Sequence, residues 1–143
     1  MNHITIAALD GLEPGDCLAI CYRLANQGSE WQREVRGVLE GKASSCTPVA
    51  LWHDDGALVG WACSHDWREM QTLEQFTDER HRGRGIGTAL AAALVGAGVI
   101  DPAQLMAVFS EQTERIAERL RMQPIRYERR GSDWVCVAIP PAE

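Results

Sequence analysis

The chain has 143 residues, of which 45% are hydrophobic and 24% carry charge. These values are typical of one globular domain with a sizeable core, and they exclude a disordered chain. The net charge of −6 has the wrong sign for most nucleic-acid-binding proteins, so we expect no nucleic-acid partner.

The start of the chain and its longest apolar run argue against export and membrane insertion. No positively charged leader followed by an apolar stretch comes after Met1. The longest apolar run, residues 86–100, contains glycines and is too short to span a bilayer comfortably. We therefore expect a cytoplasmic protein with no membrane partner.

Five scattered cysteines are expected to be free thiols, because nothing indicates export. Cys17 and Cys21 lie one helical turn apart, a spacing that metal ligands also use. No second pair of Cys or His residues at zinc-ligand spacing accompanies them. We favour burial in a core for both side chains and expect no metal.

The first elements along the chain are a strand and two helices. Residues 3–9 are rich in Ile, Thr and Ala and predict a strand. Pro14 begins a predicted helix that ends near residues 26–28. Ser29 is placed to cap a second helix over residues 30–39.

Three strands follow a loop over residues 41–47. Residues 48–52 and 58–63 are apolar strands joined by His53-Asp54-Asp55-Gly56, a strong hairpin signal. Residues 70–77 are expected to continue this meander as a single strand.

The second half contains a buried apolar helix, a central strand, a helix that Gln123-Pro124 stops, and a closing hairpin. Their predicted ranges are 86–96, 105–109, 111–122, 125–129 and 134–139. This order of elements predicts an α/β fold and a single domain over residues 1–143.

A glycine-rich stretch, Arg82-Gly83-Arg84-Gly85-Ile86-Gly87-Thr88, lies between the third strand of the meander and the apolar helix. Glycine lets the backbone turn sharply and lets a ligand approach its N–H groups. A helix start leaves N–H groups unpaired beside a partial positive charge, and Arg82 and Arg84 add two full charges. The stretch therefore predicts a diphosphate site.

The spacing of these glycines excludes two common nucleotide-binding motifs. Counting Gly-x-Gly-x-x-Gly/Ala from Gly83 or Gly85 places Thr88 or Leu90 in the third position, so the dinucleotide motif fails. The P-loop fails too, because no lysine follows the glycines. The stretch does fit Arg/Gln-x-x-Gly-x-Gly/Ala, and on these residues the chain resembles the GNAT acetyltransferase superfamily.

The resemblance implies a GNAT-like α/β fold, with a mixed, mostly antiparallel central sheet and helices on both faces. It implies acetyl-CoA as the cofactor, lying in a splay between the strands that end near Thr77 and Ser110. Strand backbone would bond the pantetheine arm and polarise the thioester carbonyl, and loop amides would hold the diphosphate. The implied cofactor-binding residues are Phe76, Thr77, Asp78, Arg82, Gly83, Arg84, Gly85, Ile86, Gly87 and Thr88.

The implied reaction is direct transfer of an acetyl group to a primary amine. Glu74, on the strand before the loop, is the candidate general base and would act through water. His65, Asp66 and Glu79 are neighbours with similar claims. Each of these side chains is equally explained as surface charge at the end of a strand.

The proton donor to the departing thiolate departs from the family pattern. Many relatives carry an Asn after the central strand and a Tyr seven residues later, and these places fall at Ser110 and Ala117. Since alanine donates no proton, either Ser110 or water would protonate the thiolate, or turnover would be slow. The alternative is a catalytically silent acyl-CoA-binding or regulatory module.

The expected acceptor is an amine of a small molecule or protein, and a homodimer is the candidate assembly. Acidic residues in the first half would suit a cationic amine, although ordinary solvated faces explain them as well; they are Asp16, Glu30, Glu34, Glu40, Asp66 and Glu69. Trp31 and Trp67 are candidates to line that pocket, whereas core packing is expected for Trp52, Trp61 and Trp134. Arg115, Arg119 and Arg121 are interpreted as a solvated helix face.

Overall fold

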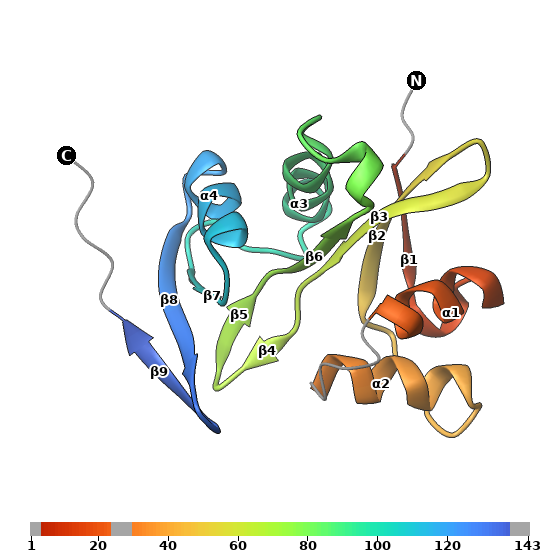
Figure 1. The fold of residues 1–143 in the computed structure, drawn as a ribbon, viewed down its shortest axis with the longest axis horizontal. Coiled ribbons are helices and arrows are strands. Elements are labelled where there is room, and N and C mark those ends of the chain that lie inside the picture. Colours follow the sequence, from red (N-terminus) through yellow and green to blue (C-terminus); the bar gives the residue numbers. More distant parts are fainter. Residues whose placement is uncertain (1–3, 24–29, 138–143) are drawn as a thin grey trace.

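The computed structural model describes residues 4–23 and 30–137 (Figure 1). It contains two β-sheets that lie side by side and diverge from each other at one end. The first sheet is antiparallel, in the order β1-β2-β3-β6, with β1 (Ile4–Ala8), β2 (Pro48–Asp54), β3 (Ala57–Cys63) and β6 (Glu74–Thr77). The second has the order β4-β5-β7-β8-β9, with β4 (Asp66–Trp67), β5 (Met70–Thr72), β7 (Leu105–Val108), β8 (Gln123–Arg130) and β9 (Asp133–Val137). Its central strand β7 pairs in parallel with both neighbours. The mixed α/β fold that the sequence predicted is confirmed.

Helices cover both faces of the four-stranded sheet (Figure 1). The helices are α1 (Pro14–Arg23), α2 (Glu30–Leu39), α3 (Ile86–Gly96) and α4 (Glu111–Arg119), with short 3-10 turns over Leu9–Gly11 and Glu79–His81. α1 and α2 pack on one face, α3 packs on the other, and α4 lies against β7 and β8. None of the helices in the described ranges is both long and apolar enough to cross a lipid bilayer.

Two hydrophobic cores result from this arrangement. Leu90 and Leu94 of α3 are fully buried in the same core as Met106 of β7, which explains why α3 is apolar almost all round. Ile20 of α1 and Trp31 of α2 fill the core on the opposite face of the four-stranded sheet. The loop that leads into α3 is therefore held by a rigid helix on a packed sheet.

The strand predicted over residues 70–77 is interrupted at Leu73. Before it, β5 pairs in parallel with β7 at Gln71 and Thr72; after it, β6 pairs only with β3. Leu73 is itself 2% exposed, in the core under α3. A splay therefore opens between β6 and the end of β7, where the family resemblance places the cofactor.

Several predicted boundaries need correction. β2 continues through His53 and Asp54, because the hairpin is closed by the two-residue turn Asp55-Gly56, both at positive φ. The predicted helix over 111–122 ends at Arg119, before Gln123-Pro124, and those two residues begin β8. Ser29 and the first helix's predicted end at 26–28 lie outside the described residues, as does the end of the last strand.

The backbone at the C-terminus of α4 explains why the helix ends earlier than predicted. Arg121 adopts φ +60°, and its N–H donates to the Glu118 carbonyl at 3.0 Å. The N–H of Met122 donates to the Ala117 carbonyl at 2.9 Å. This is the Schellman pattern, with arginine where glycine is usual, so no glycine marks the end of the helix in the sequence.

The tryptophans and cysteines divide between core and surface. Trp31 and Trp61 are buried against one another, so Trp31 belongs to the core and Trp61 is confirmed there. Trp134 is 36% exposed, against the prediction of core packing, and caps an aromatic cluster with Trp67 and other rings of the five-stranded sheet. Cys17 and Cys21 are buried free thiols, as the burial interpretation predicted.

Candidate active site

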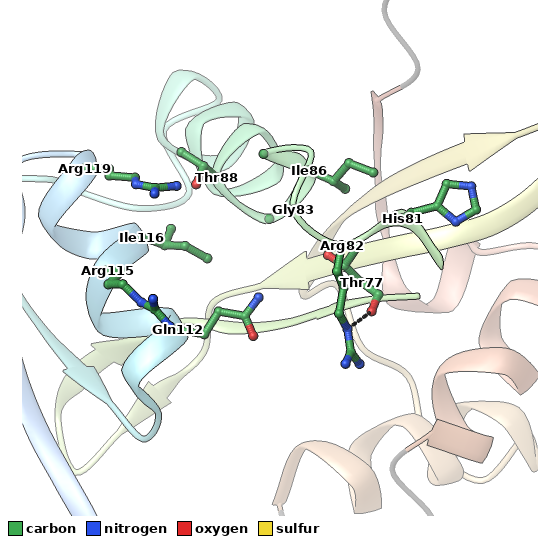
Figure 2. Close-up of a pocket in the computed structure, with 12 residues that line it drawn as sticks. Thr77, His81, Arg82, Gly83, Ile86, Thr88, Gln112, Arg115, Ile116 and Arg119 are labelled. Carbon is green, nitrogen blue, oxygen red and sulfur yellow. Dashed lines mark hydrogen bonds between the residues drawn. The ribbon is translucent and has the colours of Figure 1, made fainter. Parts of the chain in front are cut away.

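The glycine-rich loop is bent by two residues in the left-handed region. Gly83 and Gly85 have φ of 79° and 76°, and Gly85 is the residue from which α3 begins. Arg82 anchors the loop to β6, because its Nε donates to the Thr77 carbonyl at 3.0 Å. Figure 2 shows the guanidinium of Arg82 turned toward β6 rather than toward the glycines.

The loop presents a run of unpaired amides. Among the described residues, no backbone or side-chain oxygen accepts a hydrogen bond from the N–H groups of residues 83–88, and the first paired amide of the helix is Ala89, bonded to the Gly85 carbonyl at 3.0 Å. A Cβ built on Gly83 or Gly85 meets nothing within 4 Å, so the space beside these amides is open. Free amides at a helix start fit an anion such as a diphosphate.

Two buried polar side-chain atoms on β6 also fit a polar ligand at this place. Thr77 is 5% exposed, and neither its Oγ1 nor the Oε1 of Gln75 has a hydrogen-bond partner within the described ranges. The Gln75 oxygen lies only 3.0 Å from a Cβ built on Gly87, which places it under the start of α3. Buried polar atoms without partners are rare in proteins, so their gathering beside the free amides fits a polar ligand such as the pantetheine and diphosphate of acetyl-CoA.

The free edge of β6 differs from the predicted one. The N–H of Asp78 donates to the Val59 carbonyl at 2.7 Å, so this amide belongs to the sheet and is not available to a pantetheine arm. Because hydrogen bonding alternates along an antiparallel strand, the backbone of Phe76 also faces β3. Gln75 and Thr77 instead present their backbone to the splay. Gln75 was missed by the sequence analysis, although period-2 alternation from Thr77 points to it.

A cavity of about 290 Å³ lies between the glycine-rich loop and α4, and Thr77 of β6 also lines it (Figure 2). The lining residues are Thr77, His81, Arg82, Gly83, Gly85, Ile86, Gly87, Thr88, Gln112, Arg115, Ile116 and Arg119. Three arginines and no carboxylate stand in this set. Arg115 and Arg119 are exposed, as the sequence predicted, but they face the cavity rather than open solvent, which the interpretation as a solvated face missed.

The opposite side of β6 carries the candidate base. Glu74 accepts a hydrogen bond from, or shares a proton with, His65, whose Nε2 lies 3.3 Å from Glu74 Oε1. The imidazole stacks on Trp31 at 6.2 Å between ring centroids, and the His65 carbonyl accepts bonds from the N–H and hydroxyl of Thr72. Both partners of the pair are thus held in place, with side chains 17% and 24% exposed.

Electrostatics around this pair favour a charged imidazole. Burial lowers the pKa of His65, but the hydrogen bond and charge of Glu74, the backbone of Asp66 and the charge of Glu34 together raise that pKa above its ordinary value. The thiol of Cys63 is fully buried, and burial, followed by the charges of Glu74 and Glu34, raises its pKa well above the usual range. Cys63 is therefore a neutral thiol and not a nucleophile at neutral pH.

Comparison with protein families identifies the fold. The Acetyltransferase (GNAT) family matches residues 18–101, more than half of the chain. The chain belongs to the GNAT acetyltransferase family. No curated protein matches this GNAT chain.

Solved structures agree on the fold. A ribosomal-protein-alanine N-acetyltransferase from Brucella melitensis biovar Abortus 2308 is 16% identical, with a TM-score of 0.53, over 95% of this chain and 97% of that one. A GNAT-family protein from Xanthomonas campestris pv. campestris is 21% identical, with a TM-score of 0.53, over 87% of both chains. At these identities the likeness concerns the GNAT fold alone.

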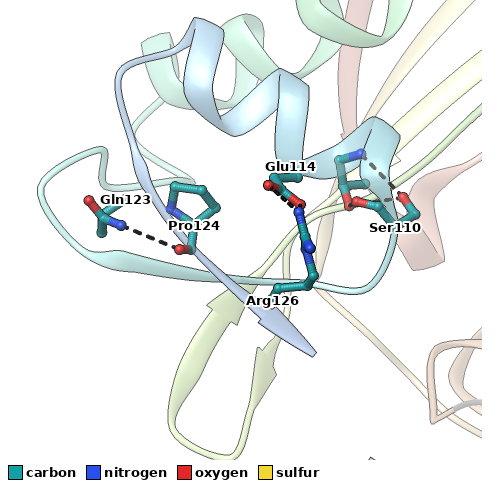
Figure 3. A network of polar contacts seen from close by, with 6 residues as sticks. Ser110, Glu114, Gln123, Pro124 and Arg126 are labelled. Carbon is teal, nitrogen blue, oxygen red and sulfur yellow. Dashed lines mark hydrogen bonds and ion pairs between the residues drawn. The ribbon is translucent and has the colours of Figure 1, made fainter. Parts of the chain in front are cut away.

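Ser110 of this GNAT protein caps α4 (Figure 3). Its Oγ accepts from the Thr113 N–H at 3.2 Å, and the two hydroxyls lie 3.0 Å apart. Because the Thr113 hydroxyl also bonds the Ser110 carbonyl at 3.0 Å, the Ser110 proton is directed at Thr113. Ala117, at the place of the family tyrosine, is fully buried in the core, and the neighbouring Ile116 faces the cavity.

α4 is fixed by a partly buried ion pair formed by residues that do not line the cavity. Glu114 is 8% exposed and receives two bonds of 2.7 Å from Arg126 of β8 (Figure 3). A bidentate arginine–carboxylate pair is directional, so it sets the rotation of α4. This rotation turns Arg115 and Arg119 toward the loop.

The acidic residues of the first half do not gather into one pocket. Asp16 pairs with His53 at 2.9 Å, and Glu40 pairs with Lys42 at 3.1 Å on the surface. Glu34 accepts bonds from the hydroxyls of Ser45 and Thr47. Asp66 and Glu69 are exposed on the β4–β5 hairpin, and the side chain of Glu30 lies outside the described part. Local pairing and solvent account for the five carboxylates that are described.

Proposed function

We propose that this GNAT protein is an acetyl-CoA-dependent N-acetyltransferase that transfers the acetyl group directly to a primary amine of a small molecule or protein. The observation that carries the proposal is the run of unpaired amides at residues 83–88, facing a cavity lined by three arginines and no carboxylate. A neutral or cationic ligand would gain little from these groups, whereas a diphosphate matches them.

The chain's own groups suit the binding of an extended acyl donor. Acetyl-CoA, when bound, supplies an activated thioester. The loop amides of residues 83–88 would hold its diphosphate, with Arg82 fixing the loop and Arg84 adding charge. The β6 edge at Gln75 and Thr77 would bond the pantetheine arm in the manner of an added strand, in place of Phe76 and Asp78.

Glu74 is the proposed general base, and His65 is its partner. The imidazole of His65, 3.3 Å from the carboxylate, orients Glu74, and water links the carboxylate to the acceptor amine. Deprotonation of the ammonium form of the acceptor is required because only a neutral amine has a lone pair to attack a thioester. Asp66 and Glu79 remain candidates, but both are exposed, and neither side chain has a hydrogen-bond or ion-pair partner among the described residues that would orient it.

Ser110 or water would protonate the departing thiolate. Two substitutions separate this role from helix capping, since asparagine caps helices well but has no hydroxyl. We expect Ser110→Asn to lower turnover while Ser110→Thr retains it, with both variants folded. Equal turnover in the two variants would assign the protonation to water.

The test of the proposal is binding followed by turnover. Isothermal titration with acetyl-CoA, CoA and NAD is expected to show binding of both CoA species and none of NAD. Thiol release from acetyl-CoA is then measured across a panel of primary amines, including polyamines, aminoglycosides and lysine peptides. Absence of binding by both CoA species would refute the proposal.

A second candidate is a catalytically silent acyl-CoA-binding or regulatory module. The observation that favours it is Ala117, which supplies no proton donor at the family's position. This candidate predicts the same binding of acetyl-CoA but no thiol release with any amine of the panel. Clear turnover with one amine would remove it.

A further inference from the structure

The α4 wall of the cavity carries positive charge in addition to the positive end of the glycine-rich loop. The loop amides and the start of α3 form the wall that suits a diphosphate. Arg115 and Arg119 stand on the other wall, on α4, one helical turn apart, and Thr88 lines the same cavity from α3 (Figure 2). The two walls therefore offer two separate places for anions.

Neither of these two guanidinium groups has an ion-pair partner in the described part of the chain. Among residues 4–23 and 30–137, no carboxylate lies within ion-pair distance of Arg115 or Arg119, although α4 itself carries Glu111 and Glu118. By contrast, Arg126 of β8 forms two hydrogen bonds with Glu114 of α4. One face of α4 thus carries a paired carboxylate, and the face toward the cavity carries the two arginines. Like charges one turn apart repel each other, and an anion between them would relieve the repulsion.

We propose that Arg115 and Arg119 bind a phosphomonoester, the phosphate that CoA carries on its ribose apart from the diphosphate. The inference rests on the proposed function and extends it, because it makes these two residues determinants of donor specificity. Guanidinium groups bind phosphate through paired, charge-assisted N–H bonds, and two of them one turn apart converge on one anion. The cavity then distinguishes acetyl-CoA from a donor that has the diphosphate and thioester but lacks this third phosphate.

The competing arrangement places the two arginines on the same diphosphate that the loop holds, closing over it from the opposite side. The two arrangements differ in one measurable respect. If the arginines contact the diphosphate, their loss weakens donors with and without the third phosphate alike. If they contact the third phosphate, their loss weakens only the donor that has it.

The experiment compares acetyl-CoA with acetyl-3′-dephospho-CoA by isothermal titration at one fixed ionic strength, because exposed charges are screened by salt. The variants are Arg115→Gln, Arg119→Gln and the double variant, in which glutamine keeps helix propensity and most of the stem. The control is Arg36→Gln on α2, an exposed helical arginine outside the cavity with the same change of charge. Circular dichroism and Tm report whether each variant stays folded.

We expect the unmodified protein to bind acetyl-CoA about tenfold more tightly than the dephospho donor, the factor that one good charge-assisted contact supplies. Each single variant is expected to reduce this preference several-fold, and the double variant to abolish it. Binding of the dephospho donor should stay within about twofold throughout, and Arg36→Gln should change neither donor.

Two results would overturn the inference while the proposed function stands: equal affinity of the unmodified protein for both donors, or a parallel loss of both donors in the double variant. Failure of the unmodified protein to bind either donor would remove the proposed function and this inference together. The two failures are therefore distinguishable from the first titration.

Discussion

The two faces of β6 are built in opposite ways. On the face toward α3, Thr77 and Gln75 hold buried side-chain oxygen atoms that have no partner among the described residues, and the amides of the neighbouring loop likewise find none there. On the face toward α1 and α2, Glu74 is paired with His65, and Phe76 packs into the core under the guanidinium of Arg23 at 4.9 Å. One face leaves its hydrogen-bonding capacity open, and the other uses it internally.

The two faces differ in how they contribute to the stability of the fold. An unpaired buried polar group costs about 1–3 kcal/mol of folding free energy. A buried hydroxyl such as that of Thr77 is therefore tolerated only when the surrounding packing offsets this cost. The fully buried leucines of α3 and the core under α2 supply that packing on both sides of the sheet. The face with unpaired groups is the one on which we propose the acyl donor binds, and the face with paired groups holds the proposed base Glu74 in place.

The largest effect should come from charge placed on the open face. Gly85→Asp sets a carboxylate at φ 76° beside the free amides, and we expect acetyl-CoA affinity to fall by about 100-fold or more through repulsion of the diphosphate. Gly98→Asp is the matched control, because Gly98 has the same φ of 76°, equally open surroundings and a position outside the cavity. Isothermal titration measures the acetyl-CoA affinity of both variants. A similar loss of affinity in the two would mean that backbone strain, and not the added charge at the site, is responsible.

A smaller effect is expected on the satisfied face. Glu74→Gln keeps the hydrogen bond to His65 but removes the base, so thiol release should fall by about 100-fold while acetyl-CoA affinity is unchanged. Steady-state thiol-release kinetics measures the change. The control is Glu79→Gln, an exposed carboxylate near the loop, which should retain activity. If Glu79→Gln shows the loss and Glu74→Gln does not, the base is Glu79 and the assignment to Glu74 is wrong.

Two buried threonines test the contrast in stability directly. Thr77→Val replaces an unpaired hydroxyl, so we expect the free energy of unfolding to rise by about 1 kcal/mol and acetyl-CoA affinity to fall several-fold. Thr72→Val removes the 2.7 Å bond to the His65 carbonyl and should lower the free energy of unfolding by about 1 kcal/mol. Urea unfolding measures both. Destabilisation by Thr77→Val would show that its hydroxyl is paired after all.

The smallest effect is the pH dependence of the His65–Glu74 pair. Because the folded protein holds the pKa of His65 above its ordinary value, the imidazolium stabilises the fold fully below the unfolded-state pKa. That stabilisation is lost as the pH rises through the folded-state pKa. The difference in free energy of unfolding between the unmodified protein and His65→Gln should therefore shrink as the pH rises past the ordinary pKa of histidine and through the raised pKa of the folded state. A difference that grows with pH would contradict the direction of the shift, and Glu74→Gln should flatten the profile.

Local sequence signals predicted most of the elements. The helix over residues 30–39 and the apolar helix over residues 86–96 match α2 and α3 at both ends. By contrast, the β4–β5 hairpin went unnoticed, because its turn is Arg68-Glu69, two residues at positive φ that carry no glycine or asparagine signal. The same holds for Arg121 at the end of α4. Unusual backbone angles on ordinary residues are imposed by packing and leave no local trace.

By itself the sequence determined the family, the α/β fold and the place of the glycine-rich loop, because glycine spacing, hydrophobic period and turn chemistry all act over a few residues. Only the tertiary structure decided which amides of β6 are open, that Glu74 is held by His65, and that Arg115 and Arg119 face the loop. Those features depend on strand register and on the rotation of α4, which contacts between distant residues such as Glu114 and Arg126 set. No local pattern encodes a contact whose partners lie on separate elements.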